Sequence, residues 1–156
     1  MNPPSTAVRT REGGYTLVEL LVVLMMVAIG VSVAAPSVRE AMTRNRTRAA
    51  VDNLTSDIAL ARMYAVREGW PVSVRIDSPT VYRVTIDTSA LNPRLIKRVR
   101  LTDEFAGVQL SPGSGTLTFS ARGLLRRADF AVIRATRQGA SDSVVVTSVG
   151  RTYRGY

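Results

Sequence analysis

One acidic side chain, Glu19, lies inside the longest apolar segment of the chain, which extends from Tyr15 to Pro36. No side chain between Leu20 and Ala35 carries a charge. A carboxylate costs roughly 2.5–3.5 kcal/mol at the centre of a bilayer and less near its interface, so an acid within such a segment indicates a function. Opposite charges attract strongly where the dielectric constant is low, and each is costly if left alone. We therefore expect Glu19 to have a function and a positively charged partner.

The composition argues against catalysis. The chain has no cysteine and no histidine, which excludes disulfides, thiolate nucleophiles and thiolate-held metals and removes the commonest general base. The acidic pair Asp103 and Glu104 is interpreted as a turn rather than a metal site, and the short glycine stretches do not form a phosphate loop. We expect a protein that is not an enzyme, with no cofactor and no metal ion.

The net charge of +9 is carried almost entirely by arginine, since Lys97 is the only lysine. A net positive charge of this size favours contact with nucleic acid, anionic lipid or an acidic partner. The preference for arginine over lysine has a second explanation, a genome rich in G and C. Charge alone therefore leaves the partner open.

The apolar segment predicts a transmembrane helix, because roughly 21 residues at about 1.5 Å each cross a hydrocarbon core of about 30 Å. A secretory signal peptide is the alternative, with "VSVAAPS" as its cleavage site. Glu19 argues against it, because a disposable peptide gains nothing from such an acid. Arginines lie on both sides of the segment: Arg9 and Arg11 before it, and Arg39, Arg44, Arg46 and Arg48 after it. By count alone, the positive-inside rule would place the C-terminal side in the cytoplasm.

Residues 37–68 predict an amphipathic helix that continues from the apolar segment. Apolar side chains recur at intervals of three and four: Val51, Leu54, Ile58, Ala61 and Ala65. Gly69 and Pro71 should end this helix, and Pro36 should kink it because proline removes a backbone hydrogen bond. The apolar stripe is interpreted as the side that packs in a core.

Residues 70–156 predict a β-rich head. Alternating apolar and polar residues bounded by turn residues predict strands at 71–76, 80–87, 94–101, 115–120, 130–136 and 143–151. Residues 110–115, "LSPGSG", are interpreted as a loop. The fold class is therefore α+β: a long N-terminal helix, transmembrane in its first half, packed on a C-terminal antiparallel β-sheet head.

The strand at 94–101 has a basic side. Alternation sends Arg94, Arg98 and Arg100 to solvent and Lys97 to the opposite face, with Leu95, Val99 and Leu101 as inward positions. Charged side chains protect an exposed edge strand from aggregation, which is the interpretation favoured for this cluster.

The stretch "GGYTLVELLVVLMMVAIGVSVAAP" resembles the N-terminal signal of type IV prepilins and type II secretion pseudopilins. The resemblance implies that residues 1–14 are a leader, which prepilin peptidase removes by cutting between Gly14 and Tyr15. Tyr15 would then be the mature N-terminus and would be N-methylated. Residues 15–36 would form the transmembrane and filament-core helix of a type IV pilin fold.

The same resemblance gives Glu19 and Pro36 their roles. Glu19 becomes the fifth mature residue, which in this family is thought to meet the positive N-terminal amine of a neighbouring subunit. Pro36 matches a proline of many members. The family is a single-pass inner-membrane family with a cytoplasmic N-terminus and a periplasmic head, so the resemblance reverses the orientation given by the arginine count. Membrane lipid, prepilin peptidase and other pilins or pseudopilins in a pilus or pseudopilus are the partners implied.

The head resembles the GspH and FimT type of minor pilin and pseudopilin. The matching stretches are "ALARMYAVREGWPVSVRI", "LTFSARG" ending at Gly123, and "VVVTSVGRTYRGY", interpreted as a final strand. The two C-terminal cysteines of major pilins are absent, which favours a minor subunit. The resemblance implies a structural subunit of a type IV pilus or of a type II secretion pseudopilus.

An alternative function is DNA binding in natural transformation. Some FimT-like pilins contact DNA through a Gly-Arg-x-Arg motif near the C-terminus, and here Gly150 and Arg151 fit while Arg154 comes one residue late. On a strand, that shift moves a side chain to the other face. Tyr153 offers a ring for stacking, and the candidate contacts also include Arg126 and Arg127. Such binding would be independent of sequence and sensitive to salt; a generic basic tail is the alternative.

Overall fold

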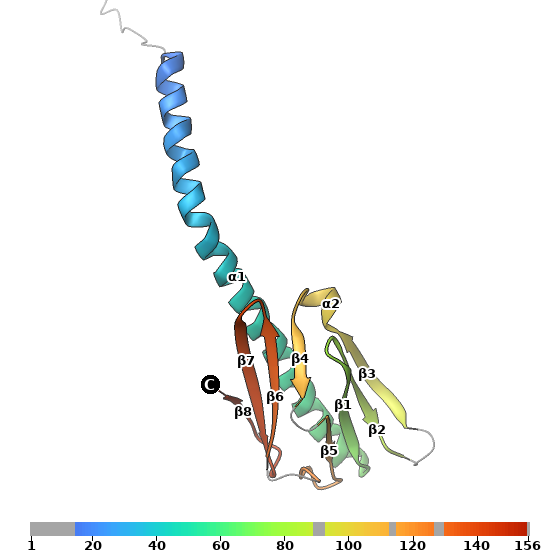
Figure 1. The fold of residues 1–156 in the computed structure, drawn as a ribbon. Coiled ribbons are helices and arrows are strands. Elements are labelled where there is room, and N and C mark those ends of the chain that lie inside the picture. The colour runs from blue at the N-terminus through green and yellow to red at the C-terminus, as the bar shows by residue number, and fades with distance from the viewer. Residues whose placement is uncertain (1–14, 89–92, 113–114, 127–129, 156) are drawn as a thin grey trace, which may run out of the picture. The chain divides into compact units, whose positions relative to one another are not determined.

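The computed structural model describes residues 15–88, 93–112, 115–126 and 130–155 (Figure 1). The chain divides into two compact units, residues 1–39 and residues 40–156. The predicted leader, 1–14, lies outside the described residues.

A single helix, α1 (Leu17–Glu68), belongs to both units, and it continues through Pro36. It ends where predicted: the amide of Gly69 donates to the carbonyl of Ala65 at 3.1 Å, and Gly69 adopts a φ of 72°. A positive φ at the residue after a helix favours glycine, because a side chain there would be strained.

The head contains two antiparallel sheets of four strands each. The first has the order β3-β2-β1-β5 and contains β1 (Val72–Ser78), β2 (Val81–Ile86), β3 (Arg94–Arg100) and β5 (Thr116–Phe119). The second has the order β4-β6-β7-β8 and contains β4 (Gln109–Pro112), β6 (Phe130–Arg137), β7 (Ala140–Thr147) and β8 (Thr152–Gly155). A short helix, α2 (Leu101–Glu104), follows β3. The predicted α+β fold is confirmed.

The core of the head forms between the C-terminal part of α1 and both sheets (Figure 1). The predicted stripe is buried as expected, with Val51, Leu54, Ile58, Ala61 and Ala65 each at most 2% exposed. These side chains belong to the same cluster as Val84 of the first sheet and Val144 of the second. Burial of apolar surface on one helix face therefore holds both sheets to α1.

The C-terminal part of the chain differs from the prediction. The prediction of a single strand at 143–151 is wrong. Instead, β7 ends at Thr147, a turn follows, and β8 begins at Thr152. The turn needs Gly150, which adopts a φ of 73°. The predicted continuation failed because valine and threonine favour strands on both sides of this turn.

Two further elements were missed. Residues 110–115 were expected to be a loop, but Leu110 to Pro112 belong to β4, which forms an edge of its sheet. Proline is tolerated there because an edge strand needs fewer ladder donors. Asp103 and Glu104, interpreted as a turn, lie in α2.

The third strand bears out only part of its predicted alternation. Val99 and Leu101 are buried as expected, but Leu95 is 52% exposed. The register shifts between the pairs Val84–Lys97 and Thr85–Leu95, so one extra residue, Ile96, is inserted. This bulge places Ile96 against the core and turns Leu95 outward.

Candidate functional site

The N-terminal half of α1 is an apolar surface that nothing in the described chain covers. All side chains from Tyr15 to Ala34 are exposed. Among the described residues, α1 is the one helix long and apolar enough to cross a membrane. A helix that is apolar on all sides requires lipid or protein around it. This half of α1 fits a membrane anchor.

Glu19 lies in the first turn of α1, at a position that the sequence prediction explained only in part. Its backbone amide donates to Oγ1 of Thr16 at 3.2 Å, so Thr16 caps the helix. The spacing Thr-x-x-Glu is that of a capping box, a signal in the sequence that was overlooked. An acid in the first turn also interacts favourably with the helix dipole, by about 0.3–1 kcal/mol. The carboxylate itself has no ion-pair partner among the residues that the structure describes.

The other predicted processing and assembly residues lie just before α1, within it, or outside the described residues. Tyr15 precedes the helix and is 87% exposed, and Pro36 lies within it. Gly14, on the other side of the predicted cleavage site, lies outside the described residues.

The structure separates the candidate DNA-binding residues. Arg154 forms ion pairs with Asp52 and Asp142, each at 3.0 Å, so two carboxylates neutralise its charge. Arg151 and Tyr153 are exposed and line a shallow pocket of about 400 Å³ together with Arg62 of α1.

Of the remaining two candidates, Arg126 is the one that the structure describes, and it does not line this pocket. Arg126 is exposed elsewhere, and Arg127 lies outside the described residues. The late position of the second arginine in "GRTYR" thus gives it a different partner, an acid on α1.

Three stretches that resemble the GspH and FimT type meet at one point of the structure. Nε of Arg62, from α1, donates to the carbonyl oxygen of Gly123 at 3.2 Å. Gly150, in the turn before β8, lies against the same groups: a Cβ placed there would be 2.7 Å from that oxygen and 2.9 Å from Cδ of Arg62. The helix and the two loops can approach this closely only because both loop positions lack a side chain.

Replacing Gly150 by alanine should therefore destabilise the head by about 2–4 kcal/mol. The left-handed backbone costs roughly 1–2 kcal/mol with a side chain, and the contact with a backbone oxygen adds to it. The free energy of unfolding, measured by urea denaturation of the full chain in detergent, tests this value.

Gly69→Ala is the matched control. Gly69 has a φ of 72°, against 73° for Gly150, but nothing lies within 4 Å of a Cβ placed there. It should lose only the cost of the left-handed backbone, about 1–2 kcal/mol. Equal losses in the two variants would contradict the close approach.

A buried polar network also joins α1 to the first sheet. Asp57 is 3% exposed, accepts a hydrogen bond from the hydroxyl of Tyr82 at 2.7 Å, and forms an ion pair with Lys97 at 2.7 Å. Burial, and then the hydrogen bond to Asp57, raise the pKa of Tyr82 above its ordinary range. Lys97 lies on the inward face, as alternation predicted.

Asp57 was not among the predicted functional residues. It follows Leu54 by three positions and precedes Ala61 by four, so the helical period alone places it on the buried stripe. A buried carboxylate requires partners, and the spacing was the available signal.

Comparison with known families gives two matches. The family described as Type II transport protein GspH matches residues 50–150, and the Prokaryotic N-terminal methylation motif matches residues 9–35. None of the curated proteins compared with the chain matches it in sequence.

Solved structures share the fold. The type IV minor pilin FimU of Pseudomonas aeruginosa is 18% identical, with 72% of this chain and 90% of that chain covered and a TM-score of 0.59. The minor pseudopilin EpsH from the Type 2 Secretion System of Vibrio cholerae is 14% identical, with 70% and 96% covered and a TM-score of 0.58.

Proposed function

The chain belongs to the GspH family of type II transport proteins and is a minor pilin or pseudopilin, and from this premise we propose how it is processed, held in the membrane and assembled. The leader, residues 1–14, is cut after Gly14 by prepilin peptidase. Tyr15 is then N-methylated, residues 15–36 enter the membrane and later the filament core, and residues 37–68 join this segment to the head, 70–156. The product is a structural subunit of a type IV pilus or of a type II secretion pseudopilus.

The uncovered apolar half of α1 supports this proposal most directly. Glu19 is the only charged side chain between Tyr15 and Val38, and every residue from Tyr15 to Ala34 is exposed in the isolated chain. Lipid covers the apolar surface before assembly, and the apolar helices of neighbouring subunits cover it afterwards. The carboxylate then pairs with the amine that cleavage creates at Tyr15 of a neighbouring subunit.

The protein crosses the inner membrane once, with its N-terminus in the cytoplasm and its head in the periplasm. This orientation rests on the N-terminal methylation motif, since the peptidase cuts on the cytoplasmic face. The arginines after the apolar segment outnumber those before it, and this number alone favours the opposite orientation. DNA binding at Arg151 and Tyr153 stays a prediction from the sequence and is not part of this proposal.

Replacing Gly14 by leucine should leave the leader uncut, because a bulky side chain would occupy the peptidase site where glycine is expected. Intact-mass measurement of protein purified from membranes of a host with a prepilin peptidase provides the test. The wild-type protein should lose residues 1–14 and gain a methyl group, whereas the variant should keep Met1.

Gly30→Leu serves as the control, because Gly30 lies within the exposed helix and nothing is within 4 Å of a Cβ there. This variant should be cut normally. A wild-type N-terminus at Met1, or a cut near Ala35 that releases the head, would contradict the proposal.

A further inference from the structure

Three arginines, the arginine row, lie in line across the outer face of the first sheet. Arg75 of β1 is paired with Arg83 of β2, and Arg83 is paired with Arg98 of β3, on three strands that lie side by side (Figure 1). The chain neighbours of Arg83, Tyr82 and Val84, are buried in the core, so Arg83 points away from it. Paired residues on neighbouring strands share one face of a sheet, so all three side chains point outward.

The arginine row is accessible and carries more positive than negative charge. The side chains of Arg75 and Arg83 are 60% and 33% exposed, and Arg98 is exposed as well. The pairing of β1 with β2 skips Asp77, an extra residue at a bulge, whose carboxylate contacts Arg83 at 3.2 Å and Arg75 at 3.6 Å. Arg98 forms no ion pair with any residue that the structure describes. One aspartate thus accompanies three arginines.

This alignment opposes folding, because like charges directly opposite one another on neighbouring strands repel. Protection of an edge strand, the interpretation of the basic strand from its sequence, explains charge on β3, which is an edge of the sheet. It does not explain Arg75 and Arg83, because β1 and β2 are inner strands. An arrangement that works against the stability of its own sheet indicates a binding function.

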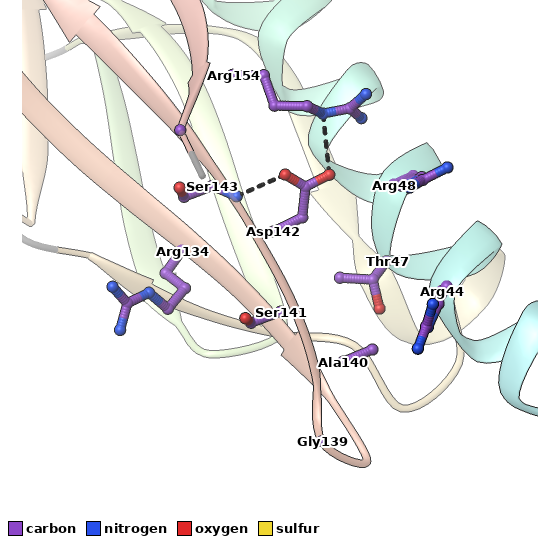
Figure 2. A pocket seen from close by; sticks show the side chains of 11 residues that line it. Arg44, Thr47, Arg48, Arg134, Gly139, Ala140, Ser141, Asp142, Ser143 and Arg154 are labelled. Atoms are coloured by element: carbon purple, nitrogen blue, oxygen red, sulfur yellow. Dashed lines mark hydrogen bonds and ion pairs between the residues drawn. The ribbon is translucent and has the colours of Figure 1, made fainter.

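The arginines around a pocket beside β7 show no such alignment. Figure 2 shows Arg48 on α1 and Arg134 on β6. Arg134 is paired with Ser111 and Ser143 on the neighbouring strands, so it has no arginine opposite it. Exposed arginine alone therefore does not produce a row, and these two residues provide a control for charge without alignment.

The length of the arginine row matches the spacing of charges on an acidic helix. Neighbouring strands are about 4.8 Å apart, so the row extends over about 10 Å from β1 to β3. Carboxylates at positions i, i+4 and i+7 lie on one side of an α-helix and extend over about 10.5 Å. Three side chains on one face of an extended chain extend over about 13 Å. The spacing therefore favours a helix over an extended segment.

Nucleic acid is the other polyanion that arginine binds well. The three strands that carry the row contain a single aromatic side chain, Tyr82, and it is buried. The row therefore offers no ring on which bases could stack. Guanidinium groups bind carboxylates through two parallel hydrogen bonds, so the observations favour an acidic protein over nucleic acid.

We propose that the arginine row binds an acidic helix of a neighbouring protein chain. Three carboxylates on one side of that helix pair with Arg75, Arg83 and Arg98, and they offset the repulsion among the arginines. This inference goes beyond the proposed function and needs neither leader cleavage nor Glu19.

The test uses the full-length, uncut protein in neutral detergent and fluorescence anisotropy of three labelled alanine-based peptides, each about 20 residues long so that it is helical. The first carries glutamates at i, i+4 and i+7, on one side of the helix. The second carries them at i, i+5 and i+10, which spreads the same charge around the helix. The third has glutamine in place of the glutamates of the first. The first peptide should bind at least about tenfold more tightly than either of the others.

Replacing both ends of the row, Arg75→Gln with Arg98→Gln, should weaken binding of the first peptide by at least about tenfold. This variant keeps the closer of the two contacts of Asp77. Arg48→Gln with Arg134→Gln removes the same charge from exposed arginines outside the row, and it should change binding by less than about twofold. Urea midpoints no lower than that of the wild type establish that both double variants are folded.

Three results would overturn the proposal: equal binding of the first two peptides, equal weakening by the two double variants, or displacement of the first peptide by an equal concentration of duplex DNA. The last result would assign the row to nucleic acid instead. Because the measurement involves neither leader cleavage nor filaments, failure here leaves the assembly role of Glu19 unaffected, and failure of that role leaves this result unaffected.

Discussion

Replacing Glu19 by alanine is expected to leave leader cleavage intact and to abolish incorporation into filaments. In the filament core the carboxylate would face the amine of Tyr15 from a neighbouring subunit, and removing one partner leaves the other charge alone at low dielectric. Breaking such a pair costs about 3–5 kcal/mol, or at least about a hundredfold in affinity. Immunoblots of sheared filaments and of membranes measure incorporation, and intact mass measures cleavage.

Thr16→Ala separates the capping of the helix from the proposed pairing of the Glu19 carboxylate. It removes the hydrogen bond from the amide of Glu19 to Thr16 but keeps the carboxylate, so it should cost only about 1 kcal/mol of helix stability and allow filaments to form. Glu19→Gln keeps the size of the side chain and should fail like alanine. Normal incorporation of Glu19→Ala would show that this acid is dispensable for assembly.

Replacing Asp57 by alanine should destabilise the head by about 2–3 kcal/mol. The change removes the charged acceptor of the Tyr82 hydroxyl, which also donates to Asn53, and it removes the partner of Lys97. Loss of a buried ion pair costs about 3–5 kcal/mol, and the value expected here is lower because the Lys97 side chain is 43% exposed. Urea denaturation of the full chain in detergent measures the change.

Asp77→Ala is the matched control, since Asp77 also contacts two cations, Arg83 at 3.2 Å and Arg75 at 3.6 Å, but at the surface. It should lose less than about 1 kcal/mol. Equal losses from the two aspartates would show that burial of the Asp57 network contributes nothing.

The titration of Tyr82 provides an independent readout of the same network. The folded head holds the Tyr82 proton more tightly than the unfolded chain, where a tyrosine titrates near about 10, so stability should fall as the pH rises above this value. In Asp57→Ala the pKa of Tyr82 should move back toward its ordinary range, because the hydrogen bond and the negative charge of Asp57 are gone. Ultraviolet titration of the tyrosines detects this change.

The sequence by itself determined the features that depend on near neighbours in the chain. The uninterrupted apolar run predicts the membrane segment, the spacing of three and four from Val51 to Ala65 gives the buried helix face, and alternation finds most of the strands. The residues around Gly14 and Glu19 also match the N-terminal methylation motif, because that motif is a short linear stretch of the chain.

Only the tertiary structure decided which distant residues meet. Asp57 and Lys97 are 40 residues apart, and Arg154 and Asp52 are 102 apart. Their pairing depends on the strand order of each sheet and on the side of α1 that each sheet covers. The turn that separates β7 from β8 was likewise hidden, since both flanking stretches favour strands and only the fit of Gly150 against Gly123 and Arg62 fixes its place. Local periodicity encodes which face of an element is buried, whereas packing between elements selects the contacts made there.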